Sequence, residues 1–325
     1  MSTIFDDYVV PAPIADAVHA LVTAKSAFIA SGGAIVETVT GATLGGHLFT
    51  RPRWNEDGTR AEIIDGTAST PSAIGTSPDI APVTRRKRVR TSIDGTLAAI
   101  GLGSANPDAA ALDQSAAYWA REIDSALVGV CKGLFDGSAG ALRTTHRRSI
   151  AAASGTAVPI AYAQAVRAAA LLGDNLLDLS VMVVHSLQWA DLALEIGAKG
   201  LITFVPSVQG NPIPYLGTMR VVVSDAVPVS GSGAFAKYTA FLVAPGALYV
   251  AVQQDLREFR QTAAAIPASI LTETLHFAPG VSGCKYVGST VSPTDVELAT
   301  AADWAKSTAN NKLIRIVALE TNASA

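Results

Sequence analysis

The feature that most constrains the fold is a long run of apolar residues at helical spacing. Its members recur every three or four positions, as one face of a helix requires, and are Leu112, Ala116, Trp119, Ile123, Leu127, Val130 and Leu134. Asn106-Pro107-Asp108 supplies a cap residue, a first-turn proline and an acid near the positive end of the helix dipole. A helix over 108–135 would be about 42 Å long at 1.5 Å per residue. Long core helices also occur in α/β enzymes, so this length alone does not decide the class of protein.

A second informative stretch covers residues 181–225, where the pattern predicts a strand, a helix and two further strands. The strands are predicted at Val181–Val184, Leu201–Val205 and Met219–Val223, which are short apolar or β-branched runs. The helix between the first two is predicted to be capped by Ser186 and to end at Gly197. Its inner side is predicted to consist of Leu187, Ala190, Leu194 and Ile196. Nothing in this stretch has a catalytic appearance.

The remaining elements are mixed helices and strands. A helix is predicted over Pro159–Leu172 before Gly173, and another from Ser292 through Trp304. Strands are predicted at Tyr238–Val243 and Ala247–Val252 around a turn at 244–246, at Ile270–Phe277 and Cys284–Val287 around a turn at Pro279-Gly280, and at Leu313–Leu319. No regular βαβ alternation is present, so the fold class is α+β.

Residues 1–47 have little core of their own. One amphipathic helix is predicted over Ile14–Ile29 and a strand over Ala34–Val39, separated by Ser31-Gly32-Gly33. Such an arm would be hard to stabilise within a monomer, so we expect it to lie across neighbouring subunits.

A Gly-, Thr-, Ser- and Pro-rich stretch follows over residues 55–82, between extended segments at Leu48–Trp54 and Val83–Ile93. A loop of this length without its own core is either functional or disordered. The flanking segments favour a hairpin that packs on another subunit over a disordered linker.

Composition excludes several classes of protein. Apolar residues make up 49% of the chain, but no uninterrupted apolar run approaches the ~20 residues of a membrane-spanning helix. Asp6 and Asp7 stand where a secretory signal has basic residues, so no export signal is expected. The formal net charge of −3 argues against a dedicated nucleic-acid-binding protein. Cys131 and Cys284 are expected to be free thiols.

No motif predicts catalysis. Gly101 and Gly103 lack the third glycine of a dinucleotide fingerprint, since Asn106 stands in its place. His185 and Ser186 are neighbours in sequence and are expected to point in different directions, without a GxSxG elbow. The other histidines, His19, His47, His146 and His276, show no metal-ligand spacing. We therefore expect no catalytic, cofactor-binding or metal-binding residue, and no cofactor.

The sharpest charge feature is Thr84–Arg90, with five basic residues in seven. In an extended segment, Arg86, Arg88 and Arg90 share one face, and Arg85 and Lys87 share the other. Such a run can bind phosphate backbones or form the solvated edge of a hairpin. We favour a contact with acids of an adjacent subunit. A weaker cluster, Arg143, His146, Arg147 and Arg148, is equally consistent with a surface loop.

An ordered series of segments resembles the major capsid proteins of tailed bacteriophages. It comprises VVHSLQWADL, LITFVP, PYLGTMRVVVSDAVPV, YTAFLVAPGALYVA, HFAPGVSGCKY, SPTDVELATAADW and KLIRIVALET, and covers Tyr118 to Leu319. The resemblance implies a structural protein, not an enzyme, that forms hexamers and pentamers of an icosahedral head around double-stranded DNA. It implies DNA contact of a non-specific kind, no membrane, and scaffolding, portal and decoration proteins as further partners. The location implied is the virion, with assembly in the host cytoplasm.

The same resemblance implies a division of the chain. It places an N-terminal arm at 1–47, an E-loop at 48–94, a P-domain with its spine helix at 95–150, an A-domain at 151–253, returning P-domain strands at 254–292, and a C-terminal helix and strand at 293–325. Two alternatives stay open: the shell of a bacterial encapsulin compartment, and an α/β enzyme that forms a small oligomer.

Overall fold

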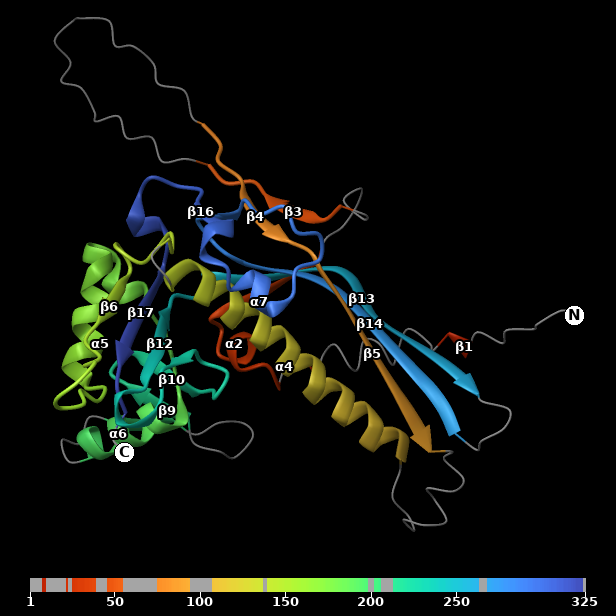
Figure 1. Ribbon diagram of the computed structural model, residues 1–325, viewed down its shortest axis with the longest axis horizontal. Coiled ribbons are helices and arrows are strands. Elements are labelled where there is room, and N and C mark those ends of the chain that lie inside the picture. Colours follow the sequence, from red (N-terminus) through yellow and green to blue (C-terminus); the bar gives the residue numbers. More distant parts are fainter. Residues whose placement is uncertain are drawn as a thin grey trace, which may run out of the picture.

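The structure is a computed structural model in which mixed sheets surround one long helix (Figure 1), as the α+β prediction requires. It describes residues 8–9, 22, 25–38, 46–54, 75–93, 107–136, 139–197, 202–205, 213–262 and 268–323. None of the helices in these ranges is long and apolar enough to span a membrane.

The long helix α4 runs from Pro107 to Phe135, within one residue of its predicted start. The side chains of its predicted inner face are at most 4% exposed, and those described are Ala116, Trp119, Ile123, Leu127, Val130 and Leu134. The side chain of Leu112 lies outside the described residues. Figure 1 shows α4 crossing the molecule, with sheets on both sides of it.

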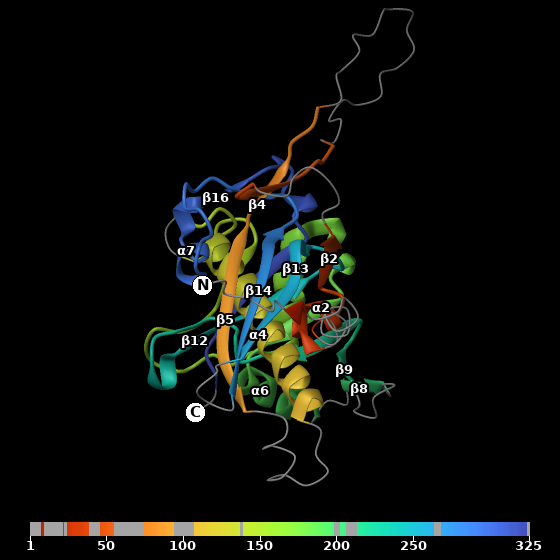
Figure 2. The ribbon, with the colours of Figure 1, turned by 90° about the vertical axis from the view of Figure 1, so that its right-hand side faces the viewer.

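The sheet with the longest strands, which we call the long sheet, lies beside α4 in both ribbon views (Figures 1 and 2). Its strand order is β1-β13-β14-β5, and β2 also pairs with β13. The strands are β1 (Tyr8–Val9), β2 (Ala34–Thr38), β5 (Thr84–Ile93), β13 (Leu248–Thr262) and β14 (Ala268–Val281). β13 and β14 form a long antiparallel pair, and β5 runs antiparallel to β14 from Thr84 opposite Phe277 to Ile93 opposite Ala268.

A second sheet has the order β6-β17-β12-β7-β10-β9-β8, with β11 paired to β12. Its strands are β6 (Arg147–Ser149), β7 (Val181–Val184), β8 (Ile202–Val205), β9 (Ile213–Leu216), β10 (Met219–Val223), β11 (Val229–Ser230), β12 (Lys237–Val243) and β17 (Ile316–Thr321). Its helices are α5 (Tyr162–Ala169), the 3-10 helix η1 (Ala170–Asp178) and α6 (Ser186–Gly197). The three strands predicted over 181–225 are confirmed, and β9 is an additional one.

The third sheet has the order β16-β15-β4-β3 and lies at the top of Figure 1. Its strands are β3 (Leu48–Arg51), β4 (Asp79–Pro82), β15 (Cys284–Tyr286) and β16 (Trp304–Lys306). The short helix α7 (Asp295–Leu298) packs on α4. Further 3-10 turns are η2 (Gly233–Phe235), η3 (Ala301–Asp303) and η4 (Asn311–Leu313).

The extended segments around residues 55–82 pair differently from the prediction. β3 pairs with β4, from Leu48 opposite Pro82 to Arg51 opposite Asp79, so the hairpin closes on residues 79–82. The segment Val83–Ile93 does not complete this hairpin. It enters the long sheet as β5 because β14 supplies ten consecutive partners for it.

The turn predicted at Pro279-Gly280 is also wrong, because β14 continues to Val281. Proline cannot donate to a ladder, but the pairing of β14 with β5 ends at Phe277, so Pro279 is not required to donate there. Gly280 lets the strand pass the ring of Tyr249, since an added Cβ would lie 2.3 Å from Tyr249 Cζ. The turn falls at Gly283, which has a φ of 88°.

Two predicted helix ends shift as well. The helix predicted from Ser292 through Trp304 stops at Leu298, where α7 ends, and Trp304 starts β16. Thr294 caps α7 in a capping box with Glu297. The helix predicted over Pro159–Leu172 begins only at Tyr162 and passes into η1, which is interrupted at Gly173 with a φ of 61°.

The predicted inner side of α6 is wrong. Leu187 and Leu194 are 45% and 76% exposed, and Ala190 is exposed too, whereas Leu192 is fully buried. Gln188 lies one turn before Leu192 on the same face of α6 and is also buried. Its amide donates to Thr321 Oγ1 at 2.8 Å and to the Tyr238 carbonyl at 3.1 Å. A buried glutamine with its hydrogen bonds satisfied reverses the face that hydrophobicity alone predicts. The side chain of Ile196 lies outside the described residues.

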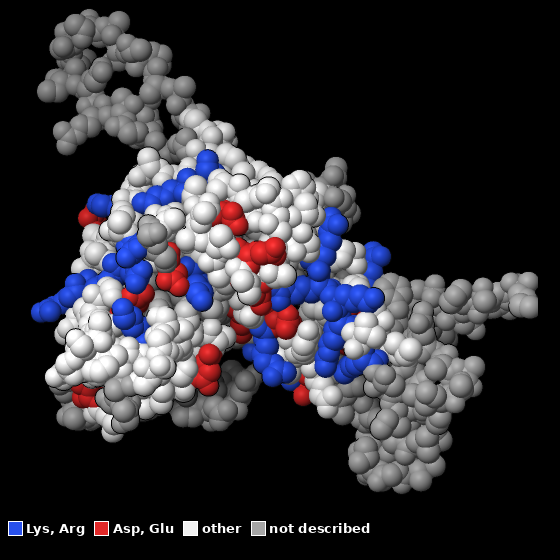
Figure 3. Space-filling model, in the orientation of Figure 1, with Lys and Arg blue, Asp and Glu red and all other residues white. Residues whose placement is uncertain are grey.

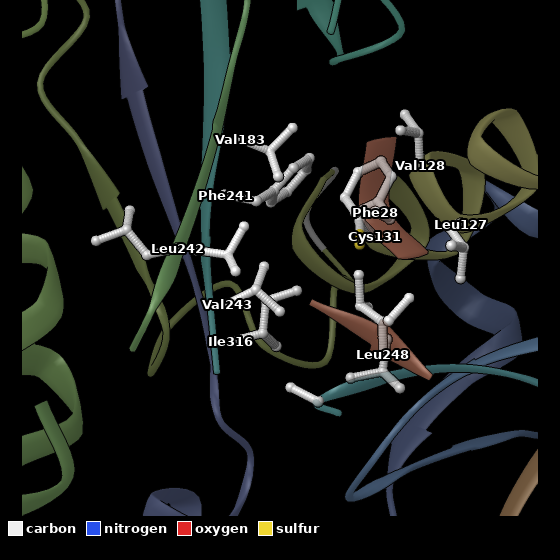
Figure 4. Close-up of a cluster of buried hydrophobic side chains, with 14 of the residues drawn as sticks. Phe28, Leu127, Val128, Cys131, Val183, Phe241, Leu242, Val243, Leu248 and Ile316 are labelled. Atoms are coloured by element: carbon white, nitrogen blue, oxygen red, sulfur yellow. The ribbon is translucent and has the colours of Figure 1, made fainter. Parts of the chain in front are cut away.

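The second half of the predicted arm packs within its own subunit. Ser26 has extended backbone and caps the short helix α2 (Ala27–Ala30), so no single helix runs through to Ile29. Phe28 is fully buried, and β2 pairs in parallel with β13. Figure 4 shows Phe28 beside Cys131 of α4, among the strand residues of the core. Residues 25–38 therefore belong to the core, and the rest of the predicted arm lies largely outside the described residues.

Gly133 shows how closely α4 is covered. An added Cβ would lie 2.5 Å from the Leu298 carbonyl oxygen and 2.7 Å from Trp304 Cδ1. In an exposed helix Gly→Ala stabilises by up to ~1 kcal/mol. Here Gly133→Ala is expected to lower the free energy of unfolding by about 1–3 kcal/mol through overpacking.

Chemical denaturation of the purified subunit measures this effect. Gly129→Ala is the matched control, because its added Cβ would come no closer than 3.1 Å to Asp295 O, and its loss should be smaller. A stabilised Gly133→Ala variant would contradict the packing of α7 and β16 on α4.

Candidate functional site

The basic run Thr84–Arg90 lies on β5 and alternates as predicted. Arg85 and Lys87 are exposed, whereas Arg86, Arg88 and Arg90 are partly buried. The alternation follows from the extended backbone of β5, which sends successive side chains to opposite faces.

Arg88 and Arg90 converge on the carboxylate of Glu273 in β14, whose side chain is only 1% exposed. Arg90 Nη2 lies 3.0 Å from Oε1, and Arg88 Nη1 lies 3.6 Å from Oε2. Trp119 Nε1 donates to Oε2 at 3.2 Å, and Ser115 Oγ donates to Oε1. Arg88 also stacks over the Tyr118 ring at 4.1 Å. A buried carboxylate with this many donors joins the sheet to α4.

Arg86 makes a second connection on the same face. Its guanidinium donates to Glu122 Oε2 of α4 at 2.6 Å and to both oxygens of Asp295 at the start of α7. Ser125 Oγ donates to Asp295 at 2.8 Å. Burial disfavours the charged guanidinium, but the hydrogen bonds and charges of Asp295 and Glu122 outweigh this and raise the pKa of Arg86.

We call this set the spine network: Arg86, Arg88, Arg90, Ser115, Trp119, Glu122, Ser125, Glu273 and Asp295. In Figure 3, blue and red side chains interleave on this side of the molecule. The described acids that pair with the inner face of the run, Glu122, Glu273 and Asp295, belong to this chain. Arg86, Arg88 and Arg90 therefore have ion-pair partners within the subunit, and their contact with acids of an adjacent subunit stays a prediction.

The weaker basic cluster is also largely internal. Arg147 Nη2 pairs with Glu320 Oε2 at 2.5 Å, and Arg147 Nη1 donates to the Phe135 carbonyl at 3.0 Å. His146 is 1% exposed, with Nε2 donating to the Asn311 carbonyl at 2.8 Å. Burial lowers the pKa of His146. Arg143, by contrast, has an exposed side chain.

His185 and Ser186 lie closer than predicted, with Ser186 Oγ 3.4 Å from His185 Nδ1. His185 Nδ1 also accepts the Leu187 N–H at 3.2 Å, and the His185 carbonyl accepts the Trp189 N–H at 2.9 Å. His185 therefore caps α6, one residue before the predicted Ser186. The two residues lie at the N-terminus of α6, where His185 Nδ1 accepts a hydrogen bond from a backbone N–H.

The cysteines form no disulfide, and the described residues contain no cluster of metal-ligand side chains. Cys131 and Cys284 are free, as predicted, and both are fully buried. Burial raises the pKa of Cys131 to about 12, and that of Cys284 is raised as well, so neither forms a thiolate readily. Within the ranges the structure describes, no three His, Cys, Asp or Glu side chains gather as a metal site requires. Gly101, Gly103 and His19 lie outside those ranges.

Comparison with known proteins decides the family. A family profile described as major capsid protein 13-like matches residues 116–314. The major capsid protein of Bacillus phage SPP1 is 31% identical over 327 residues, which cover 97% of each chain. The chain belongs to the major capsid protein 13-like family. The matched residues nearly coincide with Tyr118–Leu319, over which the sequence resemblance to phage capsid proteins was drawn.

Solved capsids share the fold of this major capsid protein at low identity. The head structure of Helicobacter pylori bacteriophage KHP40 superposes with a TM-score of 0.60 at 10% identity, over 92% of this chain and 91% of that one. The capsid of Ralstonia phage GP4 gives 0.58 at 12% identity, over 93% and 92%. The predicted capsid fold, with its long spine helix and mixed sheets, is confirmed.

Sequence reasoning missed two residues on which this capsid fold depends. Glu273 alternates along β14 with Leu271, Leu275 and Phe277, which are buried. This alternation in the sequence could have predicted that the Glu273 side chain points into the core. Asp124 on α4 accepts Ser26 Oγ at 2.6 Å and the Ala27 N–H at 2.8 Å, which holds α2 on the spine. Burial raises the pKa of Asp124, and these hydrogen bonds oppose the rise.

Replacing Glu273 tests the spine network. Its hydrogen-bond partners Arg90, Ser115 and Trp119 all donate, so the side-chain NH₂ of Glu273→Gln would face one of these donors. The same substitution would leave Arg88 and Arg90 without a carboxylate. Removing one member of a buried pair costs about 3–5 kcal/mol, and we expect a loss of that size in urea unfolding of the unassembled subunit.

The matched control is Asp174→Asn, which removes an 81% exposed carboxylate paired with Lys312 and should change stability little. Equal stability of Glu273→Gln and the parent chain would mean that the network does not join sheet and spine.

Proposed function

We propose that this major capsid protein self-associates into hexamers and pentamers of an icosahedral tailed-phage head that encloses double-stranded DNA. The observation that carries the proposal is the 31% identity with the SPP1 major capsid protein across almost the whole of both chains. The likeness to the solved KHP40 and GP4 capsids supports it. These matches favour a phage head over an encapsulin compartment or an enzyme.

The described part of the subunit fits a structural role. Several of its ionisable side chains pack within the subunit: Glu273 and Arg88 in the spine network, Asp124 at α2, and His146 and Arg147 beside β17. We infer that the chain performs no catalysis. Its function would then reside in surfaces that meet other copies.

We propose the family division of the chain with one change. The arm is 1–47 and the E-loop begins at 48. The P-domain with spine α4 covers 84–150 and 254–292, and the A-domain covers 151–253 with 293–325 returning to it. The change is that β5 joins the P-domain, which began at 95 in the family division, because β5 pairs with β14 along its whole length. The E-loop would then end near Val83.

Further partners follow from a role in the phage head. We propose assembly in the host cytoplasm, with scaffolding, portal and decoration proteins as partners and with non-specific contact to packaged DNA. Only Arg85 and Lys87 of the basic run point outward, so β5 would contribute little to DNA contact.

Electron microscopy and sedimentation of the purified protein test the proposal. We expect closed megadalton shells, and heads from infected cells should contain nuclease-protected DNA. A discrete small oligomer would overturn the capsid function, and shells that enclose a protein cargo in place of DNA would identify a compartment.

A further inference from the structure

A hollow of about 460 Å³ lies where the root of the β3–β4 hairpin meets the turn between β12 and β13. Its walls come from five separate parts of the chain: residues 51–54, Asp79, residues 245–247, Ser282, and Leu313 with Arg315. The hairpin and the two other sheets therefore share it. We call it the root hollow.

The root hollow is lined by three arginines and one acid. Arg51 is compensated by Glu37 at 3.0 Å, and Arg315 lies 3.4 Å from Asp178. Asp79 is 2% exposed, and its oxygens already accept the Gly283 N–H and the Ser307 hydroxyl. The cations thus dominate the open part of the wall.

Arg53 is the least compensated of these cations. Among the described residues, its nearest carboxylate oxygen is on Asp79, 4.0 Å from Nη1, and Nη2 donates to the Leu313 carbonyl at 3.3 Å. Nη1 has no hydrogen-bond acceptor among the described residues, and 20% of the Arg53 side chain is exposed. The exposed part of a guanidinium that lacks a close acid favours a carboxylate, which arginine binds in a planar, two-bonded geometry.

Trp54 stands beside Arg53 and is 72% exposed. Its backbone is held by a bridge to Thr76, and its side chain lines the root hollow. Tryptophan and arginine are the residues that most often dominate binding at protein interfaces. An exposed tryptophan next to an uncompensated arginine is therefore expected at a contact surface.

We propose that the root hollow is a socket for a second copy of this chain, which inserts a carboxylate side chain toward Arg53 and an apolar side chain against Trp54. This inference rests on the proposed function, since it takes the partner to be a neighbouring subunit of the shell. Charge complementarity selects an acidic segment, and the indole selects one with an apolar residue beside the acid. The socket ties the root of the hairpin to the adjacent subunit.

Photo-cross-linking identifies the occupant. Trp54→p-benzoylphenylalanine subunits are prepared unlabelled and fully ¹⁵N-labelled, mixed before assembly, irradiated as shells and analysed by mass spectrometry. We expect cross-links that join a light to a heavy chain at an acid-containing peptide, and none between chains in unassembled subunits. Cross-links within one chain only would show that the subunit fills its own hollow and would overturn the proposal.

A second measurement uses Trp54→Ala, which removes an exposed side chain and leaves the fold intact. We expect an unchanged unfolding midpoint of the isolated subunit and a rise of about tenfold or more in the concentration needed for shell formation. The matched control is Leu177→Ala, which removes a 78% exposed apolar side chain outside the root hollow, and it should assemble like the parent chain. If Trp54→Ala assembles at the parental concentration, or if Leu177→Ala is equally impaired, the socket is refuted.

The two hypotheses fail in different ways. If the parent chain forms no shells, the capsid function fails and the cross-link is never sought. If parent shells form but Trp54 links no two chains, the socket alone fails.

Discussion

The burial of one carboxylate, that of Glu273, is the interaction on which the rest of the subunit depends. A charge that is 1% exposed is stable only where donors replace its water. Here Arg90, an indole and a hydroxyl donate to the carboxylate, and Arg88 adds an ion pair at 3.6 Å. The arginines come from β5, and the indole and the hydroxyl come from α4. Satisfying Glu273 therefore requires both elements to be in place, which makes the spine and the long sheet one unit.

This unit explains how a chain with few aromatic residues supports long, thin elements. A helix of 29 residues and strands of up to 15 residues would flex if they met only along alanine and valine. The spine network pins them at points spread along α4, from Ser115 to Ser125. A shell subunit must keep its shape while its neighbours pull on it, and intramolecular ion pairs provide this before any neighbour arrives.

Much of the fold could be predicted from the sequence, since helix α4 and strands β7, β10 and β12 follow from hydrophobic periodicity and β-branched runs. The pairing of the strands could not be predicted, because β5 pairs with residues of β14 that lie 175 to 193 positions further along the chain, and β14 sets its register. The face of α6 was misjudged since buried Gln188 is polar, and hydropathy places such a residue outside. The alternation of exposed and partly buried side chains in the basic run was predicted correctly. The acids that pair with its arginines, Glu122, Glu273 and Asp295, are far apart in sequence and come together only in the tertiary structure.

The central claim is that the spine and the long sheet are joined within one subunit, before assembly. Amide hydrogen exchange of β5 and α4, compared between unassembled subunits and closed shells, tests it most directly. The account predicts that the β5 amides paired to β14, and those of α4 from Trp119 to Leu134, are strongly protected in the unassembled subunit and gain little on shell closure. Rapid exchange of β5 in the free subunit, with protection appearing only in shells, would contradict it.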